Sequence, residues 1–211
     1  MKCYHMTTLD RLESINKLGL VPRNEKNCKL VNDYKVKVFF SEGFEGSIAL
    51  FVDFYIVYNK IKNNELKIVD DILYNEVIKS NNLEEFLGSG VYLSFEMNEI
   101  INERNFENGC TSEIIEPGRL YVLGLKNLKD TTVTYSRFEI INFMMMQTKP
   151  SNIKYYGKKY HNSPSFDEAT TRIQEKVNKY YIENKEKIQN YKKERYELIE
   201  IPLKEFVKEY L

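Results

Sequence analysis

Short apolar runs and segments with helical spacing alternate along this chain. An apolar run at 1–6 predicts a strand, and a leucine or isoleucine at every third position from Leu9 to Leu18 predicts the helix that follows it. Thr7 or Thr8 is placed to cap this helix, and Gly19 is placed to end it. The chain therefore begins with a strand–helix unit.

The same pattern predicts the other elements. We expect strands at 36–41, 66–69, 91–95, 111–115, 119–125, 131–135 and 198–201. We expect helices at 45–59, at 70–86, from a capping box at 165–168 to about 195, and in a short segment after Pro202. The polar segments 24–35, 103–109 and 149–164 are expected to be loops. Two segments, 51–58 and 138–146, fit either a strand or a helix.

These elements predict an α+β fold, with antiparallel or mixed sheets flanked by helices and a long C-terminal helix. We expect one domain at 1–148, a basic and aromatic loop at 149–164, and a helical extension at 165–211 packed on that domain. The only candidate boundary is the loop, and we find no internal repeat.

The amino-acid composition limits the classes of protein to which this chain can belong. Apolar residues make up 42% and aromatic residues 13% of the chain, which is enough for a core. Basic and acidic residues number 31 each, so the net charge gives no support for nucleic-acid binding by the molecule as a whole. Two histidines and three widely spaced cysteines argue against a zinc site, and we expect no metal site. The sequence has no signal or membrane-spanning pattern, and we expect a cytoplasmic protein, or a toxin delivered without a cleavable signal.

Three polar residues stand at the edges of predicted strands. They are His5 in Tyr4-His5-Met6-Thr7, Ser41 after Val38-Phe39-Phe40, and Glu113 in Thr111-Ser112-Glu113. Taken singly, each is more often a surface residue, a helix cap or an edge-strand residue than a functional one. Their order along the chain is the informative feature.

In that order, with the helix of 9–19 and the segment Glu116-Pro117-Gly118-Arg119 included, the first 125 residues resemble the ADP-ribosyltransferase superfamily. The likeness is to its His–Tyr–Glu branch, which includes the poly-ADP-ribose polymerases, and to bacterial toxins that modify nucleic acids. The resemblance implies two small sheets with NAD in a cleft between them. It also implies an NAD-dependent transferase that moves ADP-ribose to a macromolecular acceptor, either nucleic acid or protein.

Site residues follow from the resemblance. His5 would donate a hydrogen bond to the adenosine ribose, with Met6 and Thr7 beside it. Phe39 or Phe40 would stack on nicotinamide, although the family has tyrosine in this strand. Glu113 would stabilise the oxocarbenium-like ribose, and Glu116 is an alternative acid. Ser41 would position nicotinamide or cap the next helix.

Three other functions remain open. The first is a binding module of the same fold without catalysis, and the second is an enzyme that resembles RNA 2′-phosphotransferases. The second would need basic residues near His5, and the sequence offers no matching set. The third is an interaction protein without a small-molecule site.

Overall fold

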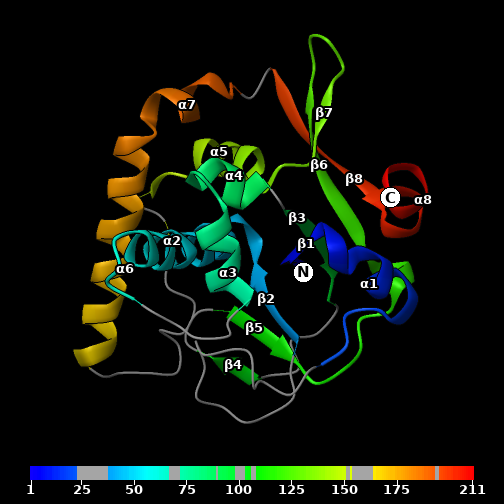
Figure 1. Cartoon of the computed structure of the whole chain (residues 1–211), viewed down its shortest axis with the longest axis horizontal. Helices are drawn as coiled ribbons and strands as arrows, with labels where there is room; N and C mark the ends of the chain where they lie inside the picture. The colour runs from blue at the N-terminus through cyan, green and yellow to red at the C-terminus, as the bar shows by residue number, and fades with distance from the viewer. Residues whose placement is uncertain are drawn as a thin grey trace.

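The computed structural model describes residues 1–22, 38–66, 72–88, 90–97, 103–105, 108–150, 153, 164–192 and 195–211. These residues form an α+β fold in which helices flank an antiparallel sheet (Figure 1). The eight strands lie in the order β4-β5-β2-β1-β3-β6-β7, and β8 pairs with β6. The expected fold class is confirmed.

The strands are β1 (Lys2–Thr8), β2 (Val38–Glu42), β3 (Gly90–Glu96), β4 (Glu103–Asn105), β5 (Asn108–Thr111), β6 (Tyr121–Asn127), β7 (Val133–Thr134) and β8 (Tyr196–Pro202). The helices are α1 (Leu12–Leu18), α2 (Gly43–Lys62), α3 (Ile72–Lys79), α4 (Leu83–Gly88), α5 (Arg137–Gln147), α6 (Pro164–Glu183), α7 (Lys185–Asn190) and α8 (Leu203–Tyr210). Two short 3₁₀ helices, η1 (Leu9–Arg11) and η2 (Pro117–Arg119), complete the described elements.

The sheet separates two cores. The face that we call the α2 face carries α2 and α5, and its core includes Tyr4, Ile48 and Ile141. The opposite face, which we call the α1 face, carries α1 and α8, and its core includes Cys3, Leu12 and Phe206. Helix α6 packs on the outer side of α2 (Figure 1). Because β3 is buried on both faces, it shows no alternation of exposed and buried residues.

The first strand–helix unit is largely as predicted. Gly19 ends α1 with a φ of 76°, a conformation that glycine adopts without strain. The helix begins with a 3₁₀ turn, however, and only its middle faces the core. Leu12 and Ile15 are buried, whereas Leu18 is 59% exposed.

The predicted helix at 70–86 is wrong in one respect, because α3 and α4 are separate. Ser80 donates to the carbonyl of Val77, and the side chain of Asn82 accepts from the N–H of Glu85. Short polar side chains that bond the backbone in this way end one helix and begin another.

The segment 103–115 also differs from its prediction. The expected loop at 103–109 contains β4 and the first half of β5, and β5 ends at Thr111, the first residue of the expected strand at 111–115. Pairing with β2 extends the sheet through this polar segment, so tertiary contacts override its low strand propensity. The two ambiguous segments, 51–58 and 138–146, both lie in helices.

The C-terminal part is more than a helical extension. The predicted helix to about 195 is interrupted at Asn184, between α6 and α7. Strand β8 then pairs with β6 along its whole length, which makes it an integral part of the sheet. Most of the predicted loops at 24–35 and 149–164, and most of the predicted strand at 66–69, lie outside the described residues.

Candidate functional site at the split between β1 and β2

Strands β1 and β2 pair only at one end. Their register is Cys3 opposite Glu42 and Tyr4 opposite Ser41, and it stops there. In β2, the residues before Ser41, Val38 to Phe40, pair with β5 instead. In β1, the residues after Tyr4 continue along β3 to Thr8. Strand β2 therefore joins a β4–β5–β2 unit to the larger β1–β3–β6 unit (Figure 1). The sheet is split between them.

His5 is the first residue of β1 beyond this pairing. Alternation along the strand places it on the α1 face with Cys3, and its side chain is partly exposed. Leu93 lies opposite His5 on β3. Thr7, on the same face by alternation, is buried. The first strand thus presents one partly accessible imidazole where the sheet divides.

Phe40 is the last residue of β2 before the pairing with β1. Its side chain is 1% exposed, and its ring meets that of Phe95 edge to face with centroids 5.6 Å apart. On the other side the ring lies directly over Gly109 of β5. A ring held in the core in this way is not free to stack on a ligand. The side chain of Phe39, the other predicted aromatic, lies outside the described residues.

Ser41 and Met6 belong to the opposite side of the sheet. Ser41 Oγ lies 2.8 Å from Ser47 Oγ and 3.3 Å from the carbonyl oxygen of Tyr4, and its side chain is buried. Ser47 donates in turn to the carbonyl of Gly43 in the first turn of α2. Met6 packs against the α2-face core. The two roles predicted for Ser41 were to position nicotinamide or to cap the next helix. These contacts hold Ser41 against the start of α2, which is closer to the second role than to contact with a ligand.

Glu113 lies in a tight turn that follows β5. Its backbone N–H donates to Thr111 Oγ1 at 3.1 Å, and its side chain is exposed. The turn is anchored beside the end of α1, because Leu20 and Ile115 exchange two backbone hydrogen bonds. Glu116, the alternative acid, is also exposed. The described residues bring His5, Phe40 and the Glu113 turn to the α1 face, and they leave Met6 and Ser41 on the other.

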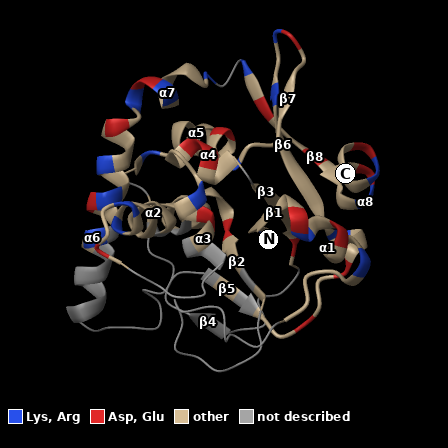
Figure 2. Cartoon of the chain, viewed as in Figure 1, with Lys and Arg blue, Asp and Glu red and all other residues tan. Residues whose placement is uncertain are grey.

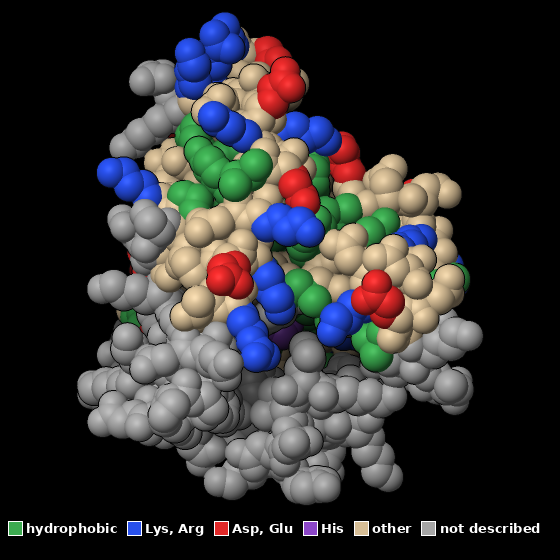
Figure 3. All heavy atoms as spheres, turned by 90° about the vertical axis from the view of Figure 1, so that its left-hand side faces the viewer, with side chains coloured by type: hydrophobic (Ala, Val, Ile, Leu, Met, Phe, Trp, Pro, Cys, Tyr) green, Lys and Arg blue, Asp and Glu red, His purple; other side chains and the backbone are tan. Residues whose placement is uncertain are grey.

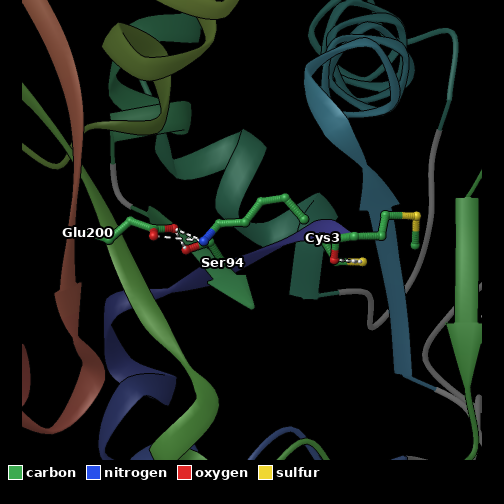
Figure 4. Close-up of polar contacts among 5 residues, drawn as sticks. Cys3, Ser94 and Glu200 are labelled. Atoms are coloured by element: carbon green, nitrogen blue, oxygen red, sulfur yellow. Dashed lines mark hydrogen bonds and ion pairs between the residues drawn. The ribbon is translucent and has the colours of Figure 1, made fainter. Parts of the chain in front are cut away.

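A polar cluster that the sequence did not reveal lies on the α2 face. Ser94 of β3 donates to the Glu200 carboxylate of β8, and Lys2 Nζ lies 2.6 Å from the same carboxylate (Figure 4). Burial, followed by the charge of Glu200, raises the pKa of Tyr4 to about 12. The only signals were Ser94 inside the apolar strand β3 and Glu200 between Ile199 and Ile201 of β8. The cluster ties together three strands that are distant in sequence.

The surface of the described residues has no dominant charge. Acidic and basic side chains are interspersed along α6 and α7 (Figure 2), and the face that carries α6 shows hydrophobic side chains between them (Figure 3). Within the described ranges no three His, Cys, Asp or Glu side chains gather as metal ligands. No described helix has both the length and the apolar character needed to cross a bilayer.

Two cavities among the described residues are lined by none of His5, Phe40, Ser41 and Glu113. The first lies beside α8, between Leu9, Tyr135 and Tyr210. The second lies between β7, α5 and the start of β8.

The chain was compared with family models, curated proteins and solved structures, and none of them matches it.

Proposed function

We propose that this protein is an NAD-dependent ADP-ribosyltransferase that modifies a macromolecular acceptor, nucleic acid or protein. The observation that carries the proposal is the split between β1 and β2. The strands β1 and β2, which carry the first two motifs, and β5, which the Glu113 turn follows, are consecutive in the sheet, and His5 stands where β1 and β2 diverge. The resemblance seen in the sequence implies NAD between two small sheets, and this division of the sheet is compatible with such an arrangement.

In the proposed reaction the bond between C1′ of the ribose and the nicotinamide nitrogen breaks, and nicotinamide leaves as a neutral molecule. A nucleophilic atom of the acceptor bonds to C1′ and loses its proton. The exposed carboxylate of Glu113 stabilises the positive charge that develops on the ribose, and it can accept the proton of the acceptor. His5 donates a hydrogen bond that holds the adenosine end.

The test is release of nicotinamide from NAD, followed by chromatography, for the full chain and for Glu113→Gln. A lost electrostatic stabiliser of this kind costs about 10²–10³ in rate. Glu116→Gln is the matched control, because it removes an exposed carboxylate three residues further along the chain. Both variants are expected to fold, since neither side chain is buried.

Loss of release in Glu113→Gln alone supports the proposal, and loss in Glu116→Gln alone transfers the role to Glu116. Absence of release from the full chain, with whole-cell RNA, DNA and protein supplied as acceptors, contradicts the proposal. Labelled NAD in the same mixture identifies the acceptor by the fraction that becomes labelled. Growth arrest on expression in bacteria, relieved by Glu113→Ala, would indicate a toxin.

The burial of Phe40 favours a second candidate, a binding module of the same fold that has lost catalysis. The ring packs on Phe95 and Gly109 and cannot hold nicotinamide during bond cleavage without leaving the core. This candidate predicts that NAD raises the melting temperature of the protein but is not consumed. If NAD neither binds nor is cleaved, both candidates are excluded.

A further inference from the structure

The second cavity lies at the end of the sheet beyond β6 and is separate from the split between β1 and β2. It has a volume of about 310 Å³, at the lower end of the range for small-ligand sites. Its walls include Glu139 of α5, the threonines of the β6–β7 turn, and Tyr191 and Tyr196 on either side of the link between α7 and β8. Backbone and side chains from four elements converge there.

Polar side chains of the β6–β7 segment that line the cavity make hydrogen bonds with residues close to them in sequence. Thr132 Oγ1 donates to Asp130 at 2.6 Å, and Thr134 Oγ1 accepts from the N–H of Ser136. Asn127 Oδ1 accepts from the N–H of Lys129. These groups shape the cavity, and the hydrogen bonds above occupy part of their capacity. The charged and aromatic residues of the lining are Glu139, Tyr191 and Tyr196.

Glu139 carries a charge that its surroundings do not balance. Its side chain is partly buried, and it makes no hydrogen bond or ion pair with another described residue. Lys187, the cation whose charge acts on Glu139, is paired with Glu84 at 2.9 Å and lies over the ring of Phe138. Burial, followed by the charge of Glu84, raises the pKa of Glu139, and Lys187 only partly offsets this. Glu139, Glu84 and Lys187 together carry two negative charges and one positive charge, so one negative charge is uncompensated.

Tyr191 and Tyr196 supply the other half of the site. Their ring centroids are 5.1 Å apart and the rings are inclined at 56°. Two inclined tyrosine rings beside a carboxylate form an electron-rich wall, which attracts cations and tolerates the apolar groups attached to them. Glu139 is the one carboxylate among the described residues of the lining, and the described residues hold no group of three acidic, His or Cys side chains for a metal ion. An organic cation satisfies both the rings and the charge.

We propose that the cavity bounded by Glu139, Tyr191 and Tyr196 binds a substituted ammonium group. The group comes either from a small amine or from a lysine side chain of a partner protein. The site does not depend on the proposed transferase activity.

The probe is tetramethylammonium chloride, and binding is followed by saturation-transfer NMR on its methyl protons with the full-length chain. Its neutral control is tert-butanol, which has nearly the same shape and no charge. We expect transfer to tetramethylammonium and not to tert-butanol. Equal transfer to both probes would show only apolar contact and would overturn the proposal.

Glu139→Gln should weaken binding at least tenfold, and Tyr196→Leu should weaken it to a similar degree. Glu186→Gln, an exposed carboxylate on α7, is the matched control and should leave binding unchanged. Unaltered binding in Glu139→Gln, or an equal loss in Glu186→Gln, would overturn the proposal. Glu139→Gln should also be at least as stable as the parent chain, so a loss of binding cannot come from unfolding.

Competition then separates the two sources of the ammonium group. Butylammonium represents a free amine, and N-acetyl-lysine methylamide represents a lysine side chain in a protein. If both displace tetramethylammonium, the tighter competitor identifies the source. Failure of both to compete would contradict an ammonium site.

Discussion

The contact between Phe40 and Gly109 gives the most direct test of how the two parts of the sheet are joined. A Cβ atom at Gly109 would lie 2.2 Å from Cε2 of the Phe40 ring, which is 1% exposed and cannot move aside. Overpacking of this kind costs about 1–3 kcal/mol. The ordinary advantage of alanine over glycine in a strand, about 0.5–1 kcal/mol, offsets part of it. We expect Gly109→Ala to lower the free energy of unfolding by about 1–2 kcal/mol.

The opposite change, Phe40→Leu, leaves a void over Gly109. Its cost should be about 1–2 kcal/mol, below the ~3–5 kcal/mol of a phenylalanine-to-alanine change. In the double variant the alanine methyl group fills the space that the shorter side chain leaves. The double variant should therefore be at least ~1 kcal/mol more stable than the sum of the two single effects predicts.

Urea unfolding followed by circular dichroism measures these free energies for all four proteins. Gly118→Ala is the control, because an added Cβ there meets no atom within 4 Å, and we expect a change within about 0.5 kcal/mol. Strict additivity of the Gly109 and Phe40 changes would refute the packing of the Phe40 ring on Gly109. It would mean that β5 does not lie against β2 in this register.

Three further outcomes follow from buried or partly buried polar groups. In a Cys28→Ser/Cys110→Ser background, the thiol of Cys3 should react with a thiol reagent at pH 8 only on unfolding. The reason is that burial, followed by the charge of Glu42, raises the pKa of this thiol to about 12. Rapid reaction of the native chain would contradict this. Glu139 has a raised pKa in the folded chain, so its contribution to stability is present at low pH and is lost as pH rises through that pKa. Glu139→Gln should therefore raise the melting temperature at neutral pH, and this gain should vanish in acid. A gain that does not depend on pH would argue against burial of the charged carboxylate as its cause. Tyr180→Phe should cost about 1–3 kcal/mol in urea unfolding, because it removes the 3.0 Å hydrogen bond to Asn142 inside the core, and a neutral effect would show that this bond is dispensable.

Local patterns in the sequence were enough for several elements. The first strand and the end of the first helix at Gly19 are consequences of strand propensity and glycine conformation, which each segment carries within itself. The largely apolar segment 45–59 was also predicted as a helix, and it lies in α2, but the choice between helix and strand at 51–58 was left open by the sequence. The order of the His5, Ser41 and Glu113 motifs was also visible, and it is the basis of the functional hypothesis.

Tertiary structure decided which segments pair and which faces they present. Pairing with β2 turned the polar segment 108–111 into a strand, and alternation along β1 and β2 sent Ser41 to the α2 face while Phe40 entered the core of the α1 face. Lys2 and Glu200 meet across 198 positions of sequence. Which strands pair in a sheet is decided by contacts between segments that are distant in sequence. The pattern of one segment therefore does not specify the strand with which it pairs.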